Sequence, residues 1–272
     1  MHPSESDRTF NGSIPQLYEQ YLVPLIFEPY AADLARRVAL RQPGSVLEIA
    51  AGTGVVTRQL ANLLAPTALI VASDLNPPML DHAAAVGTSR PVEWRQADAM
   101  QLPFPDASFD VVVCQFGVMF FPDKPKAFSE ARRALRPGGA FIFNVWDGIE
   151  HNEFADTVTQ ALAACFPANP PRFMARTPHG YHDPAAIAQD LARGGYDRTF
   201  ELTTVAERSR ASSPRIPAVA YCQGTPLRGE IEAHGPSSLS EATDVATAAL
   251  TARFGQGAVD SLIQAHVVTV ER

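Results

Sequence analysis

The chain has 272 residues, of which 46% are hydrophobic, and this is enough to bury the core of one large domain. Its formal net charge of −7 argues against a nucleic-acid backbone as partner, and the three cysteines, Cys114, Cys165 and Cys222, form no CxxC pair that would predict a metal site. The longest strongly apolar run, residues 111–121, is too short to span a bilayer, and no secretory signal is recognised. We therefore expect a soluble, cytoplasmic protein with no membrane span.

The first 146 residues contain most of the regular pattern. Residues 1–13 are polar and are expected to fray, whereas residues 16–39 carry apolar side chains at helical spacing. Because Pro24 and Pro29 interrupt that spacing, we predict two or three short helices there instead of one long helix. Short apolar strands then alternate with helices: the predicted strands are 46–49, 68–74, 92–96, 109–115 and 140–146, and the predicted helices are 55–64, 78–85 and 125–135. This alternation predicts a parallel sheet covered by helices on both faces.

The remaining residues follow a looser pattern. Helices are predicted at residues 152–164, 184–192 and 240–254, and strands at residues 199–205 and 265–270. Proline and glycine interrupt residues 209–238 repeatedly. We therefore predict an α/β core with a cap formed by helices inserted between its last two strands.

The stretch SVLEIAAGTGVVTRQLA, residues 45–61, joins a buried strand to a helix through a turn of small residues. A ligand can approach the backbone of this turn closely, and open α/β sheets bind ligands at this place, beyond the carboxyl ends of their strands. Asp74 ends the next predicted strand, 20 positions after Gly54, where a carboxylate can accept hydrogen bonds from both hydroxyls of a ribose. The pattern therefore favours an adenosine-containing ligand over an aspartate that only caps a helix.

Ligands that bind through phosphate groups fit the same stretch poorly. The dinucleotide fingerprint requires a small residue at position 57, where this chain has Thr57. A nucleotide triphosphate loop requires a lysine after a glycine, and the only two lysines, Lys124 and Lys126, do not follow one. The short-chain dehydrogenases share the α/β layout, but no lysine lies four positions after a tyrosine in this chain. Neither phosphate binding nor hydride transfer is therefore predicted.

Three further stretches follow the small-residue turn: IVASDLNPPML at residues 70–80, VEWRQADAMQLPFPDASFDVVVCQFGVMFF at residues 92–121 and EARRALRPGGAFIFNVW at residues 130–146. In this order they resemble the class I S-adenosylmethionine-dependent methyltransferases, most closely the branch of quinone-biosynthesis-type and related small-molecule enzymes. The resemblance covers roughly residues 40–205 and is more specific for fold and cofactor than for substrate. It implies an α/β, Rossmann-like fold with a mostly parallel seven-stranded sheet and an inserted helical cap. It also implies S-adenosyl-L-methionine as cofactor, with S-adenosyl-L-homocysteine as product.

For the methionine part of the cofactor, the resemblance implies contacts from the turn and from the end of the fourth strand. The residues are Glu48, which would support the cationic tail, then Ala50, Gly52, Thr53 and Gly54, and finally Gln115 and Phe116. Ala50 stands where the family more often has glycine. Tyr21 resembles an N-terminal aromatic residue that folds over the cofactor, and Tyr18 competes for that role.

For the adenosine part, the resemblance implies that Asp74 binds the ribose and that Leu75 and Met79 lie beside the adenine. Asp98 and Ala99 match the family's Asp-Ala pair, whose carboxylate accepts a hydrogen bond from the adenine amino group. Each of these residues also has an ordinary structural explanation, such as a core position for Met79. Their order and spacing together favour the cofactor site.

Methyl transfer depends mainly on holding donor and acceptor in line, so no catalytic residue is strictly required. The candidates for a general base are His151, His179 and Tyr181, although a solvated loop is the simpler interpretation of the PHGYHDP stretch at residues 178–184. His179, His182 and Asp183 lack a second ligand cluster, so no metal is predicted. An apolar or aromatic acceptor pocket is indicated by a group of large side chains: Phe116, Met119, Phe120, Trp146, Phe173 and Met174.

Two functions follow from this pattern. The first is methyl transfer to oxygen or carbon of an apolar or aromatic small molecule, and the alternative is a cofactor-binding protein of the same fold with a non-methylating or regulatory function. Nucleic-acid methylation fits less well, because there is no basic stripe and the NPPM stretch at residues 76–79 follows the wrong strand. We expect one methyltransferase domain, with an N-terminal helical arm (1–40), a cofactor-binding core (41–146) and a substrate-side half (147–272), as a monomer or a homodimer.

Overall fold

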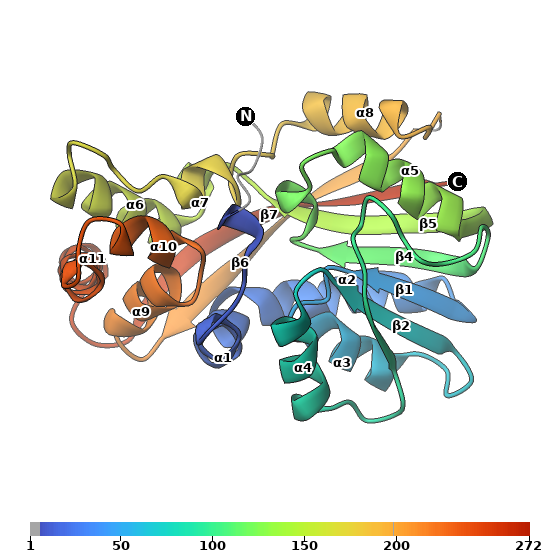
Figure 1. Ribbon diagram of the computed structural model, residues 1–272, viewed down its shortest axis with the longest axis horizontal. Helices are drawn as coiled ribbons and strands as arrows, with labels where there is room; N and C mark the ends of the chain where they lie inside the picture. Colours follow the sequence, from blue (N-terminus) through green and yellow to red (C-terminus); the bar gives the residue numbers. More distant parts are fainter. Residues whose placement is uncertain (1–5, 198) are drawn as a thin grey trace.

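The computed structural model describes residues 6–197 and 199–272. A seven-stranded sheet lies on the right of Figure 1 and a group of helices on its left. The strand order is β3-β2-β1-β4-β5-β7-β6. The first five strands of that order are parallel, whereas β7 is antiparallel to both of its neighbours. The strand bounds are β1 Ser45–Ile49, β2 Leu69–Asp74, β3 Glu93–Gln96, β4 Phe109–Gln115, β5 Leu135–Trp146, β6 Glu201–Ala211 and β7 Val259–Glu271. The predicted Rossmann-like, mostly parallel sheet is confirmed.

The central strands are buried on both faces, as their continuous apolar sequences require. On one face, α2 (Glu28–Leu40) and α3 (Val55–Leu63) pack on β1, β2 and β4 through a cluster that includes Val46, Ile70 and Val111. On the other face, α5 (Lys124–Ala134) and α8 (Pro184–Arg193) contribute Phe128 and Ile187 to the main core. The remaining helix of the core, α4 (Pro77–Val86), follows β2. Helices therefore cover both faces, as the alternation of strands and helices predicts.

The N-terminal arm begins with a short 3₁₀ turn, η1 (Ser6–Arg8). Three helical segments follow with no loop between them: α1 (Ile14–Leu17), η2 (Tyr18–Phe27) and α2. The prediction of two or three short helices agrees in number, but the segments run directly into one another. The middle segment, η2, is a π-helix with Pro24 inside it. A proline lacks the N–H group that an α-helix needs and crowds the preceding turn, and the wider π-helical turn accommodates it.

Three element boundaries differ from the prediction. Strand β5 begins at Leu135, directly after α5 and before the predicted start at residue 140, because Leu135 already pairs with Phe109. The Pro-Gly-Gly sequence at residues 137–139 therefore lies within the strand. Strand β6 extends to Ala211 because its whole length pairs with β7, which begins at Val259. The outer ends of these strands carry polar residues joined by ion pairs such as Arg208–Asp260, at 2.7 Å. The apolar alternation that predicts a strand is therefore missing at these ends, although the two strands pair there.

The helices on the left of Figure 1 form the cap: α6 (Glu153–Cys165), α7 (Phe173–Arg176), α9 (Arg215–Gln223), α10 (Leu227–Glu232) and α11 (Ser238–Phe254). The three last helices are inserted between β6 and β7, which confirms the predicted insertion, whereas α6 and α7 precede β6. Helices α9 and α10 fall in the segment that proline and glycine interrupt, and no helix was predicted there. Among the described residues, no helix is long and apolar enough to cross a membrane.

Candidate cofactor and acceptor site

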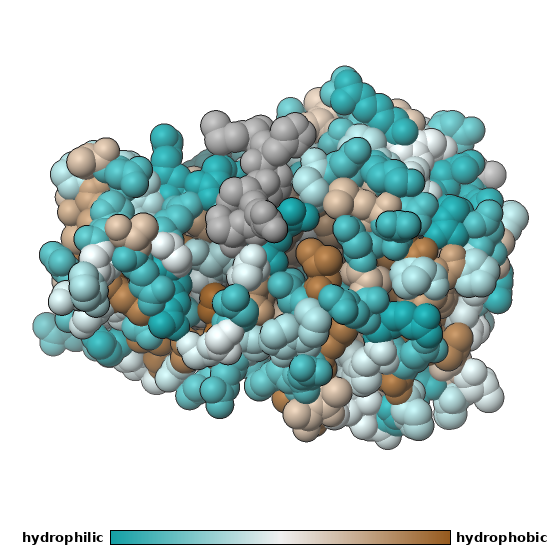
Figure 2. Space-filling view, in the orientation of Figure 1, coloured by the Kyte–Doolittle hydropathy of each residue, from teal (hydrophilic) through white to brown (hydrophobic). Residues whose placement is uncertain are grey.

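A pocket lies where the sheet, the N-terminal arm and the cap meet. Its empty volume is about 1070 Å³, part of it open to solvent, which is in the range of small-molecule sites. Figure 2 shows hydrophobic side chains near the middle of this face, between the cap and the sheet, on a largely hydrophilic surface. Most of the predicted cofactor residues line this pocket: Ala50, Gly52, Asp74, Leu75, Met79, Asp98, Ala99, Gln115 and Phe116. The other four, Tyr21, Glu48, Thr53 and Gly54, do not line it.

The small-residue turn between β1 and α3 has a left-handed backbone at three positions. The φ angles are 55° at Ala50, 57° at Gly52 and 83° at Gly54. A Cβ atom on Gly54 would lie 3.0 Å from the Trp94 ring of β3. Glycine at this position therefore allows the turn to pack closely on Trp94, and it does not line the pocket. Ala50 takes a conformation that favours glycine, which explains why the family more often has glycine there.

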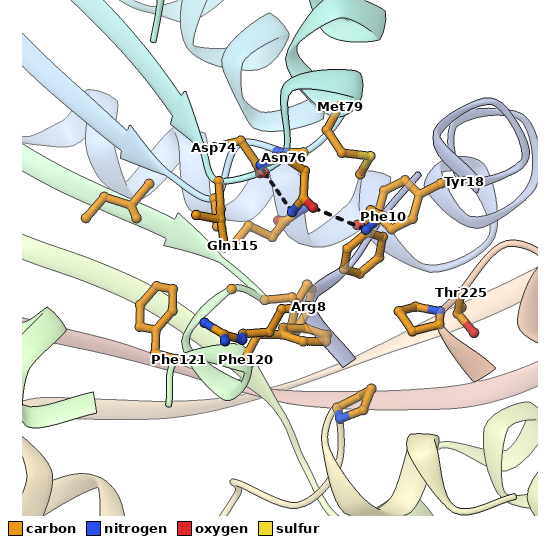
Figure 3. A pocket seen from close by; sticks show the side chains of 18 of the residues that line it. Arg8, Phe10, Tyr18, Asp74, Asn76, Met79, Gln115, Phe120, Phe121 and Thr225 are labelled. Carbon is orange, nitrogen blue, oxygen red and sulfur yellow. Dashed lines mark hydrogen bonds between the residues drawn. The ribbon is translucent and has the colours of Figure 1, made fainter. Parts of the chain in front are cut away.

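The carboxylate of Asp74 is held by the turn on one side and by its own loop on the other. Its Oδ2 accepts from the Gly52 N–H at 2.9 Å. Its Oδ1 accepts from the Asn76 N–H at 2.8 Å and from the Asn76 side-chain amide at 3.4 Å, and Figure 3 shows Asp74 joined to Asn76. Burial raises the pKa of Asp74, and these hydrogen bonds oppose the increase. Each carboxylate oxygen has about two acceptor sites, so Oδ2, with one donor, keeps a site available to a ligand, whereas Oδ1 already has two donors.

Glu48 lies at the end of β1, buried beneath the turn. It accepts a hydrogen bond from the Thr57 hydroxyl at 2.5 Å, which gives Thr57 a structural role at the position where a dinucleotide site would need a small residue. Burial raises the pKa of Glu48 to about 8, although Thr57 and the charge of Arg58 oppose the increase. Its support of a cationic tail stays a prediction, because it does not line the pocket.

The residues at and just after the end of β4 supply a further part of the pocket wall. Phe116 has a φ angle of 49°, its N–H donates to Asn144 Oδ1 at 2.8 Å, and its ring stacks on Trp146 with 3.8 Å between centroids. The neighbouring Gln115 has a buried Oε1 atom to which no described residue donates a hydrogen bond. Since buried acceptors are nearly always satisfied, this oxygen fits a donor supplied by a ligand.

Tyr18, not Tyr21, lines the pocket, and its ring stacks on Phe27 at 4.9 Å. Sequence reasoning missed Arg8 and Phe10, which line the pocket from the segment expected to fray. It also missed a group of cap residues: Pro178, Tyr221, Thr225 and Pro226. The only sequence signal for the N-terminal segment is Phe10, an aromatic residue in an otherwise polar stretch.

None of the three candidates for a general base lines the pocket. His179 is buried and its Nδ1 lies 2.9 Å from the Asp147 carbonyl, and burial lowers its pKa to about 4. Tyr181 donates its hydroxyl hydrogen to Asp190 at 2.9 Å. His151 ends a short 3₁₀ turn, η4 (Ile149–His151), and is exposed. In the described part of the chain, no group of three or more metal-ligating side chains is found.

Of the side chains predicted to form the acceptor pocket, all but one line the pocket. Phe120, Trp146, Phe173 and Met174 line the pocket with Phe116, whereas Met119 is buried in the core. Phe120 comes from the 3₁₀ turn η3 (Val118–Phe120) and lies 6.3 Å from Phe173 of the cap, centroid to centroid. The pocket therefore combines two carboxylates, Asp74 and Asp98, with a largely apolar remainder that includes several aromatic rings.

Three comparisons place this chain among known proteins. A family model described as "Methyltransferase domain" matches residues 47–143. The ubiquinone/menaquinone biosynthesis C-methyltransferase UbiE of Pseudomonas savastanoi is 39% identical over 121 residues, 43% of this chain and 46% of that protein. The demethylmenaquinone methyltransferase of Thermus thermophilus is 32% identical over 185 residues, 64% of this chain and 82% of that protein. The chain thus spans about half the length of the first relative and most of the second.

Solved structures show the same fold. Phosphoethanolamine N-methyltransferase 2 of Haemonchus contortus, in complex with S-adenosyl-L-methionine, aligns with a TM-score of 0.59 at 19% identity. The alignment covers 97% of this chain and 58% of that one. At this level of identity the likeness concerns the fold alone.

Proposed function

Since this chain belongs to the class I S-adenosylmethionine-dependent methyltransferases of the quinone-biosynthesis type, we propose that it transfers a methyl group to carbon or oxygen of an apolar, aromatic small molecule. The observation that carries the proposal is that one pocket contains both the residues predicted to bind the cofactor and the aromatic residues predicted to bind the acceptor. Asp74 and the turn lie at one side of it, and Phe120, Trp146 and Phe173 line it as well. The quinone rings named for the relatives belong to the same class of acceptor.

The residues present fit the cofactor. Asp74 would accept hydrogen bonds from the ribose, and the unpartnered Gln115 Oε1 would accept one from the ammonium group of the methionine tail. Asp98 would face the adenine amino group, and its Oδ1 is already oriented by the Met100 N–H at 2.9 Å. When bound, S-adenosylmethionine supplies a methyl group activated by the positive charge on sulfur.

The chain's own contribution to the reaction is orientation and exclusion of water. The rings of Phe116 and Trp146 lie face to face, with 3.8 Å between centroids and planes that differ by 5°, and both residues line the pocket, so the stack forms a rigid apolar part of its wall. Tyr30 and Phe27 pack against both rings, which fixes the position of the stack. A planar acceptor placed against this wall would lose most of its contact with water.

The direct test is incubation with S-adenosylmethionine labelled in its methyl group and a panel of hydroquinones, phenols and non-aromatic amines. We expect label in the aromatic acceptors and none in the amines. Tight binding of the cofactor with no transfer to any acceptor would favour the non-methylating alternative. Transfer to amines alone would contradict the proposed acceptor class.

A further inference from the structure

Arg8 brings a positive charge into the pocket from the N-terminal segment. It is the one cation among the described residues that line the pocket. Its Nε atom is buried and has no hydrogen-bond partner among residues 6–197 and 199–272. Figure 3 shows the side chain extending into the pocket on the side where Phe120 and Phe121 lie, away from Met79. An unpartnered guanidinium nitrogen in a largely apolar site has an energetic cost that an anionic ligand would remove.

The chain on both sides of Arg8 is held in place. On one side, the buried carboxylate of Asp7 accepts hydrogen bonds from Arg176 at 2.6 Å and from the Thr177 hydroxyl at 2.9 Å. On the other side, the N–H of Phe10 donates to Asn76 Oδ1 at 3.2 Å, as the dashed line in Figure 3 shows. We call residues 7–10 the strap, because in Figure 1 this part of the chain passes between the cap and the sheet. These contacts fix the backbone on both sides of Arg8 and so determine where its side chain enters the pocket.

The carboxylates of the pocket are engaged elsewhere. Both oxygens of Asp74 accept backbone hydrogen bonds from Gly52 and Asn76, and Asp98 Oδ1 accepts from Met100. The buried Asp7 pairs with Arg176 of the cap. The positive charge of Arg8 thus remains for a ligand, whereas the aromatic side chains around it select a ring.

We propose that Arg8 binds the oxyanion of a phenolate-type acceptor, so that the methyl acceptor is an acidic hydroxyaromatic compound bound in its ionised form. The inference rests on the proposed function. It accounts for a site in which none of the candidate bases lines the pocket. The hydroxyl proton leaves to water, because the guanidinium stabilises the phenolate and lowers the pKa of the hydroxyl. An electron pair of the phenolate then forms the bond to the methyl carbon, and the pair of the broken carbon–sulfur bond stays on sulfur.

An oxyanion near Arg8 could come from the acceptor or from the carboxylate of the cofactor. We assign it to the acceptor, because Arg8 reaches the pocket beside Phe120 and Phe121, whereas the predicted methionine contacts come from the turn and from Gln115. To distinguish the acceptor's oxyanion from the cofactor's carboxylate, the affinities for a phenolate and for S-adenosylhomocysteine are measured separately.

The probe is 4-nitrophenol, whose ionised form is yellow, added to the protein saturated with S-adenosylhomocysteine. Near the pKa of the free phenol, we expect the wild-type protein to bind the phenolate at least tenfold more tightly than the neutral 4-nitroanisole. Arg8→Gln should abolish this preference, and Arg8→Lys should keep part of it, because a lysine retains charge without the guanidinium geometry. The matched control is Arg36→Gln, which removes an arginine whose side chain is 67% exposed on α2.

Binding of S-adenosylhomocysteine is measured in parallel by calorimetry. We expect Arg8→Gln to change its affinity less than threefold. A large loss of cofactor affinity with unchanged phenolate binding would reassign the anion to the cofactor and overturn the proposal. Equal binding of phenolate and anisole by the wild-type protein, or no binding of either, would also overturn it. Failure of the wild-type protein to bind S-adenosylhomocysteine would instead contradict the proposed function.

Discussion

Ala50 and Gly117 are in close contact in space, and the Cβ atom of Ala50 leaves no room for a side chain at position 117. Ala50 has a left-handed backbone, and a Cβ atom on Gly117 would lie 2.5 Å from the Cβ of Ala50 and 2.7 Å from Cys114 Sγ. We expect Gly117→Ala to lower the free energy of unfolding by about 1–3 kcal/mol, the usual cost of overpacking. Adding Ala50→Gly should recover part of the loss, because it removes one of the two clashes.

Urea denaturation of the two single variants and the double variant measures this coupling. Gly229→Ala is the control, since no atom lies within 4 Å of its added Cβ. Additive effects of the substitutions at positions 50 and 117 would contradict the close contact.

Asp74 is the residue on which the adenosine side of the site depends most. Asp74→Ala removes the acceptor proposed for the ribose and also leaves the Gly52 N–H without its partner. We expect affinity for S-adenosylhomocysteine to fall by about 1.5–3 kcal/mol, which is the range for hydrogen bonds to a charged group. Calorimetry checks this, with Asp106→Ala as control because the Asp106 side chain is 74% exposed. Unchanged affinity in Asp74→Ala would exclude the ribose assignment.

Glu48 gives the protein a pH dependence of defined sign. Its carboxyl has a raised pKa, about 8 against an ordinary 4.5, because of burial. The unfolded chain therefore releases this proton at lower pH than the folded chain, and stability falls as pH rises from about 4.5 to about 8, by at most about 1.4 kcal/mol per pH unit. Glu48→Gln keeps an acceptor for Thr57 and should lack this decline. Urea unfolding between pH 5 and pH 8 measures the difference, and parallel profiles would contradict it.

At this scale, the sequence predicts the residues that lie in local motifs. Ala50, Gly52, Asp74 and Asp98 line the pocket because each stands at or near the end of a strand, and strand order brings those ends together. Arg8 could not be predicted, because its position depends on contacts of its neighbours with residues far away in the sequence, such as Asp7 with Arg176.

At the scale of elements, the strap is held to the cap by charge. Arg176 of α7 pairs with Asp7 at 2.6 Å and with Glu230 of α10 at 2.7 Å. Arg176→Met leaves the buried Asp7 without its arginine, so the strap should detach more often while the sheet stays folded. We expect limited proteolysis to cleave the N-terminal segment several-fold faster than in the wild-type protein.

The control for this experiment is Arg215→Met, because the Arg215–Asp244 pair is exposed on both sides, at 57% and 62%. Exposed pairs contribute little, so cleavage should not change. Equal cleavage rates in Arg176→Met and the wild-type protein would show that the ion pair with Arg176 is not needed to hold the strap.

Elements are predictable from the sequence where their pattern is local and apolar. Strand β4 has the predicted bounds because its apolar run is buried. The polar outer part of β6 was not predicted, because pairing with β7 alone defines it. The π-helical register of η2 was likewise not predicted, because Pro24 indicates an interruption of an α-helix and not the wider turn that accommodates it.

At the scale of the whole molecule, three parts separated in sequence share one pocket. The strap contributes Arg8 and Phe10, the sheet contributes the strand ends, and the cap contributes Phe173 and Tyr221. The single-domain organisation that the sequence predicts is compatible with this arrangement, since one continuous core joins the cap to the sheet. The position of the cap over the strand ends could not be read from the sequence, because its proline- and glycine-rich connections have no periodicity.

A ligand in such a pocket should stabilise all three parts together. At a concentration 100 times its dissociation constant, S-adenosylhomocysteine should add about 2.7 kcal/mol to the free energy of unfolding. For a chain of this size, that corresponds to a rise in Tm of very roughly 5–10 °C, scaled from about 2–4 °C per kcal/mol. Thermal unfolding measures the rise, and hydrogen exchange should show slower exchange in α7 and α9 as well as in the turn after β1. Methylthioadenosine, which lacks the amino-acid tail, is the control and should protect the turn less. Protection confined to the sheet would show that the cap does not close on the same ligand.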